Sequence, residues 1–210
     1  MLQTGHAAQA VARTRPLNRA FASTRAILAQ VQEGQLSAPT PCVSWDVRTL
    51  IDHFIGTARW AADAVSAADG AATDEAAAKA AGDAVDTGNY GAADLLARYD
   101  EAIETTLAAF GSAGVLEKTV SLPFGEFSGA ALMGLAARDQ FTHGWDLARA
   151  IGHHTDLDPE VAGELLIQAR TEITEAFRGP DGAAFFGPAA DAPASASPAD
   201  RLAAFLGRTL

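Results

Sequence analysis

Apolar residues recur at steps of three and four along most of the chain, which is the period of amphipathic α-helices. Each of the long runs shows one apolar face and one polar face. The predicted helices cover residues 17–31, about 45–68, 95–110, about 128–151, 159–177 and 199–206. Packing these faces against one another is the simplest way to bury them, so the pattern predicts an all-α helical bundle with a short C-terminal helix.

The segments between the helices have other patterns. Residues 119–122 look extended and are followed by Pro123, Phe124 and Gly125, which predicts a small β-hairpin within residues 115–127. Residues 69–91 and 179–197 are rich in Ala, Gly, Asp and Pro, so we expect loops that either cover a pocket or connect helices. We expect a single domain over residues 1–210, with residues 1–14 disordered.

Composition and charge exclude several classes of partner. The formal net charge of −11 and the lack of a basic stripe argue against nucleic acid and against anionic membranes. No apolar stretch reaches the roughly 20 residues that span a bilayer, and the N-terminus lacks the apolar core of a secretory signal. Cys42 is the single cysteine, so no intramolecular disulfide can form, and we expect a cytoplasmic protein.

The predicted helix over 128–151 interrupts its own apolar stripe. Asp139 and His143 stand one turn apart at positions where the stripe calls for apolar residues. A buried carboxylate and a buried imidazole must be satisfied, since each otherwise costs several kcal/mol. Coordination of a metal ion satisfies both groups, and so does a plain Asp–His hydrogen bond.

His53 is the candidate third ligand. It lies at the edge of the apolar face of the second helix, beside Leu50 and Phe54. A lone histidine in such a place is more often a satisfied core or surface residue. Together with Asp139 and His143, however, it supplies two imidazoles and one carboxylate, a set that binds zinc and some iron or nickel ions with positions left open.

Other polar residues have a functional and a structural interpretation. Asp146 follows His143 by one turn, so it either orients the His143 ring or serves helix packing. Arg59 and Trp60 follow His53 by about two turns and would line a substrate mouth, or lie along the helix surface. Cys42 offers a nucleophile or a fourth ligand, but a lone loop cysteine is more often a small buried hydrophobe.

Three segments resemble the metal-binding domain of the mycothiol-dependent maleylpyruvate isomerases, within the DinB-like superfamily. They are TPCVSWDVRTLIDH at 40–53, RDQFTHGWDLA at 138–148 and DRLAAFLGR at 200–208. The resemblance implies an antiparallel four-helix bundle and a divalent metal, usually zinc, held by His53, Asp139 and His143. Asp139 stands where some members have glutamate. Bundles of this superfamily often pair, so a homodimer is an expected assembly.

The resemblance implies a metal-dependent thiol S-transferase or isomerase whose metal activates a small-molecule thiol such as mycothiol toward a small electrophile. The isomerases carry an additional C-terminal domain that helps to bind the thiol, whereas this sequence ends at Leu210 soon after the bundle. That difference favours the alternative of a non-catalytic metal-binding bundle, such as a sensor, carrier or structural module. A third hypothesis is that no metal binds and that Asp139 and His143 form a buried polar pair.

Overall fold

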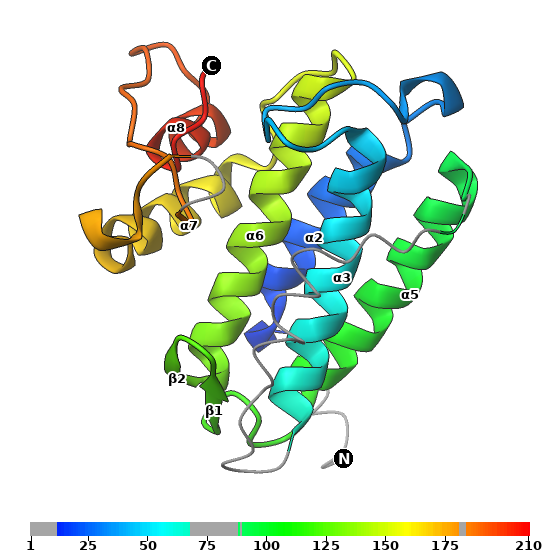
Figure 1. Ribbon diagram of the computed structural model, residues 1–210. Coiled ribbons are helices and arrows are strands. Elements are labelled where there is room, and N and C mark those ends of the chain that lie inside the picture. The colour runs from blue at the N-terminus through cyan, green and yellow to red at the C-terminus, as the bar shows by residue number, and fades with distance from the viewer. Residues whose placement is uncertain (1–11, 68–87, 89, 181–183) are drawn as a thin grey trace.

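A computed structural model describes residues 12–67, 88, 90–180 and 184–210, and within them the chain is mostly helical (Figure 1). The α-helices are α2 (Arg15–Leu28), α3 (Val47–Ser66), α5 (Ala92–Gly111), α6 (Gly129–Ala150), α7 (Pro159–Glu172) and α8 (Pro198–Phe205). The strands β1 (Thr119–Leu122) and β2 (Gly125–Ser128) form an antiparallel hairpin, and the 3-10 turns are η1 (Glu33–Gln35) and η2 (Glu175–Phe177). The predicted all-α bundle with a small hairpin and a short C-terminal helix is confirmed.

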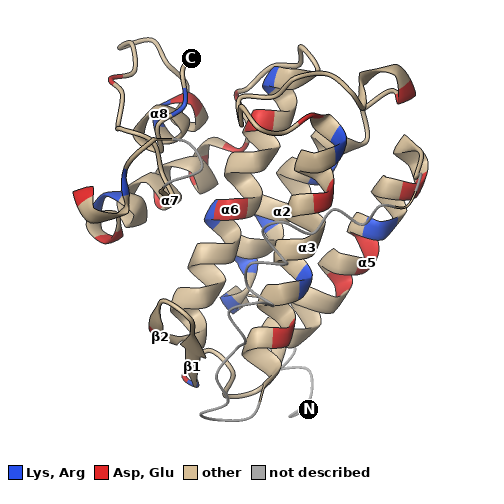
Figure 2. Ribbon diagram, viewed as in Figure 1, with Lys and Arg blue, Asp and Glu red and all other residues tan. Residues whose placement is uncertain are grey.

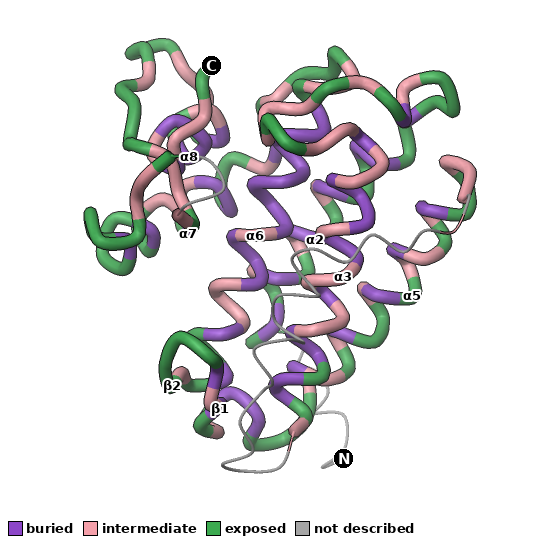
Figure 3. The backbone as a smooth tube through the Cα atoms, viewed as in Figure 1, coloured by how far each residue is buried: buried purple, intermediate pink, exposed green. Residues whose placement is uncertain are grey.

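Four helices make the bundle, and α6 is central to its packing. α2 packs against α6 and α5, and α3 packs against the same two helices, so α2 and α3 lie across the bundle from each other. α7 and α8 pack against each other and against the outer side of α6, next to the C-terminus (Figure 1). Because α6 has neighbours on both sides, most of its residues from Ala136 to Ala148 are buried (Figure 3).

Side-chain caps set the starts of several helices. The Asp46 carboxylate accepts a hydrogen bond from the backbone N–H of Thr49 at the start of α3, and Ser128 caps α6 in the same way. Asp158 and Ser197 cap α7 and α8, each followed by a proline at the first helical position. The predicted starts of α7 and α8 are therefore confirmed.

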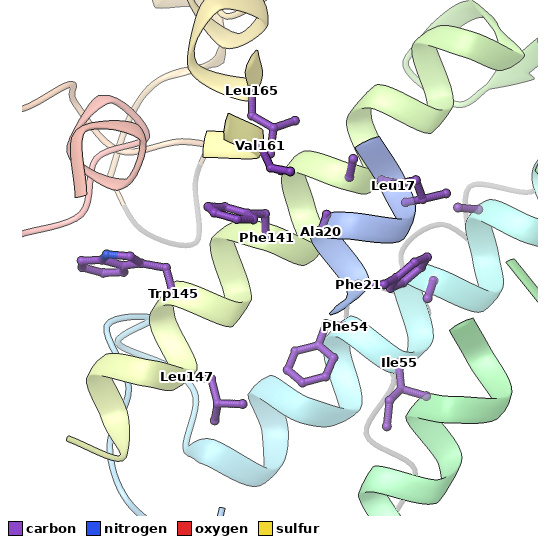
Figure 4. Packing of buried hydrophobic residues seen from close by; sticks show 14 of the residues in the cluster. Leu17, Ala20, Phe21, Phe54, Ile55, Phe141, Trp145, Leu147, Val161 and Leu165 are labelled. Carbon is purple, nitrogen blue, oxygen red and sulfur yellow. The ribbon is translucent and has the colours of Figure 1, made fainter. Parts of the chain in front are cut away.

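Large apolar side chains from the bundle helices fill the core. Figure 4 shows Phe21 of α2, Phe54 and Ile55 of α3 and Leu147 of α6 pointing into the space between these helices, and all four are buried. Phe141 and Trp145 of α6 point instead toward α7 and α8 (Figure 4). One helix thus supplies the contact surface for the bundle and for the C-terminal pair.

The described helices carry charged residues of both signs (Figure 2). Lys and Arg positions are scattered over several helices in Figure 2, and no continuous basic stripe is visible in that view. None of the described helices is both long enough and apolar enough to cross a membrane.

Among the predicted helices, the one expected over 159–177 differs most from the structure in its bounds. The helix expected over 159–177 ends at Glu172, and residue Ile173 is already extended. Thr171, Ile173 and Thr174 are β-branched, and such a run disfavours continuation of a helix. The helix expected over 17–31 spans Arg15–Leu28 and ends before Gly34 is reached.

The segments expected to be loops or disordered lie only partly within the described structure. Residues 1–11, 68–87, 89 and 181–183 lie outside it. Of the N-terminal segment, Arg13 forms an ion pair with Glu117 and Thr14 is buried. The described residues of 179–197 form an irregular segment, with one bridge between Arg178 and Phe186.

Candidate metal centre

His53, Asp139 and His143 converge between α3 and α6. The Nε2 atom of His53 lies 3.6 Å and that of His143 lies 3.5 Å from one carboxylate oxygen, Asp139 Oδ1. The two imidazole rings meet edge to face, with centroids 4.7 Å apart. Asp139 and His143 share a face because they are four residues apart on α6, and the packing of α3 against α6 brings His53 to the same point.

The spacing of these atoms fits a metal ion. Zinc lies about 2.0–2.1 Å from each nitrogen or oxygen ligand in a tetrahedral site, which places neighbouring ligand atoms about 3.3–3.5 Å apart. The measured separations from Asp139 to the two histidines, 3.6 and 3.5 Å, are close to that value and longer than an ordinary hydrogen bond. Two imidazoles and one carboxylate also form a donor set that zinc, iron and nickel accept.

The electrostatics of the site favour a cation. Burial raises the pKa of Asp139, but the charge of His143 and the proximity of the His143 and His53 rings outweigh burial and hold the pKa of Asp139 well below its usual range. Burial lowers the pKa of His143, whereas the Asp139 charge and hydrogen bonds with Asp139, Asp146 and Cys42 raise that pKa well above its usual range. The metal-free site therefore favours a proton on His143, which is the positive charge that a metal ion would replace.

A network of polar side chains holds Asp139 in place. Its Oδ2 atom accepts a hydrogen bond of 2.7 Å from the hydroxyl of Thr57, one turn beyond His53 on α3. The side-chain amide of Gln140 donates to Phe54 O at 2.8 Å and to the Thr57 hydroxyl at 3.1 Å. Gln140 therefore links α6 to the backbone of α3 and to the threonine that binds Asp139. Asp139 Oδ1, the oxygen nearest both histidines, is left to face the candidate metal position.

The other nitrogen of His143 is held by Asp146. His143 Nδ1 lies 3.0 Å from Asp146 Oδ2, and Asp146 is fully buried. Metal-bound histidines commonly donate their second ring N–H to a carboxylate, which sets the ring orientation and raises the basicity of the ligating nitrogen. Asp146 has that relation to His143.

A second group of candidate ligands, Cys42, His143 and Asp146, lies on the Nδ1 side of the same ring. The Cys42 thiol is 3.4 Å from Asp146 Oδ2 and 4.0 Å from His143 Nδ1. The guanidinium of Arg208 binds both oxygens of Asp146, at 3.1 and 2.9 Å. Because this cation already compensates the carboxylate, the second group is the poorer metal site, and the group with His53 and Asp139 is the better one.

The loop before α3 covers the site. The Thr40 hydroxyl donates to Trp45 O at 2.9 Å and accepts from Cys42 N–H at 3.1 Å, which closes the loop on itself. The indole of Trp45 lies over the imidazole of His53, with ring centroids 4.4 Å apart and an interplanar angle of 36°. This contact restricts the orientation of the His53 ring.

Each residue of the segment His143-Gly-Trp-Asp146 has a structural role that explains its identity. A Cβ atom on Gly144 would lie 2.4 Å from the hydroxyl oxygen of Thr24, so only glycine allows α2 to approach α6 this closely. The Trp145 indole N–H donates to Asp200 of α8 at 2.8 Å. The four residues therefore place a candidate ligand, a helix contact, a C-terminal anchor and the carboxylate beside His143 in one turn.

Among the residues that the sequence predicted for the site, His53, Asp139, His143 and Asp146 lie together. The Nη2 atom of Arg59 lies 3.8 Å from Oε2 of Glu101 on α5. Trp60 packs against the core, and its indole N–H is buried with no hydrogen-bond acceptor in the described part of the chain. The role of both residues at a substrate mouth stays a prediction.

Sequence reasoning missed three residues at the site. Thr57 is four residues after His53, so its helical spacing was a usable signal for a shared face. Trp45 and Arg208 reach the site through a loop and a helix end, and no helical period predicts such contacts. Trp45 and Arg208 became visible only with the tertiary packing.

Comparison with known proteins agrees with a metal-binding helical bundle. The family model of the mycothiol maleylpyruvate isomerase N-terminal domain matches residues 17–148. The chain therefore belongs to this family, which is part of the DinB-like superfamily. The match includes His53, Asp139, His143 and Asp146, whereas Arg208 lies beyond it.

The chain also resembles two curated proteins of Mycobacterium tuberculosis. They are the uncharacterized protein MT0763 of strain CDC 1551 / Oshkosh and the uncharacterized protein Rv0738 of strain ATCC 25618 / H37Rv. Each is 38% identical over 196 residues, which cover 91% of this chain and 95% of the relative. No solved structure matches the chain significantly.

Proposed function

We propose that this protein is a metal-dependent thiol S-transferase or isomerase that uses a small thiol of the mycothiol type. The observation that carries the proposal is the convergence of His53, Asp139 and His143, with Asp139 Oδ1 3.6 and 3.5 Å from the two histidine nitrogens, in a member of the mycothiol maleylpyruvate isomerase family. Zinc is the metal that this donor set and spacing suit best, with nickel and iron as alternatives.

A bound divalent metal supplies a Lewis acid that lowers the pKa of a thiol, so that a thiolate at neutral pH can add to an electrophilic carbon or assist a cis–trans isomerisation. The protein supplies the orientation. Thr57 and Asp146 hold Asp139 and His143 by hydrogen bonds, and Trp45 covers the His53 ring.

The burial of the three candidate ligands indicates where small molecules reach the site. The side chains of His53 and His143 are 11% and 10% exposed, whereas that of Asp139 is 26% exposed. Solvent contact is therefore greatest on the Asp139 side, and we infer that the thiol and the electrophile approach from that side. Trp60 and Arg59, two turns beyond His53 on α3, are our candidates for substrate contacts at a greater distance from the metal position.

A conjugation assay tests the proposed activity. Zinc-loaded protein, mycothiol and a chromogenic aryl halide should give the aryl thioether, with release of halide ion and a proton, at a rate that rises with protein concentration and that falls to the buffer rate after chelator treatment. The chelator-treated protein reloaded with zinc is the control for irreversible damage. A protein that binds zinc but leaves the rate at the buffer value would instead be a metal-binding bundle without turnover.

Metal affinity is expected to fall as the pH is lowered. The pKa of His143 is raised in the metal-free site, so a metal ion must displace a proton from this ring at every pH below the raised value. Below it, the apparent affinity should fall by about tenfold per pH unit, and above it the affinity should level off. The pKa of Asp139 is lowered, so this carboxylate adds no competing proton near neutral pH.

Competition with a chromophoric chelator between about pH 6 and about pH 9 measures this slope. Calorimetry in two buffers of different ionisation enthalpy gives the proton count independently, and we expect about one proton released per metal bound at the acidic end. A zinc affinity that does not change with pH would contradict the assignment of His143 as a ligand.

A further inference from the structure

The end of α8 delivers an arginine to the metal centre. The backbone N–H of Gly207 donates to Ala204 O at 3.0 Å, and that of Arg208 donates to Ala203 O at 2.9 Å. This pair of bonds is the Schellman arrangement, which requires a left-handed residue after the helix, and Gly207 has a φ of +92°. The cap turns the chain sharply, and Arg208 follows directly after the turn.

The position of this turn is fixed by a close backbone contact. A Cβ atom on Gly207 would lie 2.5 Å from the Cα atom of Gly187, so both the backbone angle and the space require glycine. The guanidinium of Arg178 donates to Gly187 O and to Phe205 O, each at 2.9 Å. The buried Arg178 side chain therefore ties the 184–187 segment to the last turn of α8.

α8 is also tied to α6 at its first turn. Asp200 accepts hydrogen bonds of 2.8 Å from the Trp145 indole and 2.7 Å from the Thr155 hydroxyl. Arg208 binds Asp146, the residue after Trp145. Two consecutive residues of α6 thus hold the two ends of α8, which leaves Arg208 little freedom to move relative to the metal centre.

Arg208 determines the orientation of the Asp146 carboxylate. Its Nε atom donates to Oδ1 at 3.1 Å and its Nη2 atom donates to Oδ2 at 2.9 Å, the bidentate geometry of a guanidinium with a carboxylate. Asp146 Oδ2 is the atom that contacts His143 Nδ1. Asp146 is fully buried and the Arg208 side chain is 16% exposed, so the pair lies in a medium where loss of one charge is costly for the other.

We propose that Arg208 is a positioning residue of the metal centre, which acts through Asp146 to point His143 Nε2 at the metal position. The inference rests on the proposed function, because it takes His53, Asp139 and His143 as the metal ligands. It places a determinant of metal affinity at the C-terminal helix, outside the residues 17–148 that the family model matches.

The test compares metal affinity in Arg208→Met, Arg208→Lys and the matched control Arg201→Gln. Arg201 is exposed on α8, seven residues before Arg208, and donates to the carbonyl of Ala194. Losing an outer hydrogen-bond partner of a ligand usually weakens metal binding by about 10- to 100-fold. Arg208 holds such a partner, Asp146, so we expect Arg208→Met to weaken Zn²⁺ and Co²⁺ binding by about 10-fold, the lower end of that range. Arg208→Lys keeps the positive charge but loses the bidentate guanidinium contact, so its metal affinity should lie between those of Arg208→Met and the wild type. Arg201→Gln should bind metal like the wild type.

Two readouts separate positioning from a purely structural role. The visible spectrum of bound Co²⁺ reports ligand geometry, and we expect it to shift in Arg208→Met and Arg208→Lys but not in Arg201→Gln. In an Asp146→Asn background, Arg208→Met should change metal affinity no further, because the residue through which Arg208 acts is already altered. The melting temperature of each metal-free variant shows that it is folded.

The outcomes are distinct. A wild-type protein that binds neither metal overturns the proposed function and this inference with it. A wild type that binds metal, with Arg208→Met within twofold of its affinity and an unchanged Co²⁺ spectrum, overturns only the role of Arg208. If Arg208→Met does not fold, the metal affinity and Co²⁺ spectrum of Arg208→Lys test the role of Arg208 in its place. If Arg208→Met lowers metal affinity equally with and without Asp146→Asn, the arginine does not act through Asp146.

Discussion

Replacing His143 by alanine is expected to lower zinc affinity by about a thousandfold or more, so that purified protein retains no stoichiometric metal. His143 supplies one of three candidate ligands, and it joins the metal position to Asp146 and Arg208 behind it. Elemental analysis of purified protein gives the metal content, and competition with a chelator gives the change in affinity. His53→Ala should show a loss of the same order, because it removes an equivalent nitrogen.

His153→Ala is the matched control, since His153 is an exposed histidine just past the end of α6. It should keep full metal content. Circular dichroism of the metal-free variants shows whether each one is folded, because a loss of metal through unfolding would prove nothing about the site. Unchanged metal content in both His53→Ala and His143→Ala would leave the third hypothesis, a buried polar pair of Asp139 and His143 without a metal.

Trp145→Ala is expected to destabilise the fold more than any of the ligand substitutions, by about 3–5 kcal/mol in the free energy of unfolding. The side chain is 1% exposed and lies between α6 and the C-terminal helices (Figure 4). Its removal leaves a cavity and also takes away the indole N–H that binds Asp200. Urea denaturation of metal-free protein, followed by circular dichroism, measures the change without a contribution from metal binding.

Trp145→Phe separates the two parts of this effect. Phenylalanine keeps most of the buried ring but lacks the N–H, so this variant should lose about 1–2 kcal/mol. A loss below about 1 kcal/mol in Trp145→Ala would contradict the packing of α8 against α6 that the structure shows, because a filled and buried site cannot lose an indole at so small a cost.

The helical parts of the fold could be predicted from the sequence because apolar residues recur at steps of three and four along each long helix. The same reasoning located the interruption at Asp139 and His143, since two polar residues on a buried stripe are visible as an exception to a period. His53 was less certain from periodicity, and its place in the site came mainly from the family resemblance. The structure brings the three residues together, and their role as metal ligands stays a prediction.

The parts that could not be predicted depend on contacts between distant segments. Trp45 reaches His53 through a closed loop, and Arg208 reaches Asp146 through the turn at Gly207. Helical periodicity describes only residues within one helix, so it carries no information on either contact. The early end of α7 at Glu172 is a local effect of β-branched residues, which the apolar period alone did not reveal.

The position of α6 in the bundle bears on how the protein is made. A ribosome synthesises the chain from its N-terminus, so α2, α3 and α5 leave the exit tunnel before α6, against which α2 and α3 both pack. Until α6 emerges, these earlier helices expose apolar faces that chaperones recognise, and His53 has neither Asp139 nor His143 beside it. The candidate site therefore becomes complete late in synthesis, and Arg208, almost at the end of the sequence, is the last part of it to arrive.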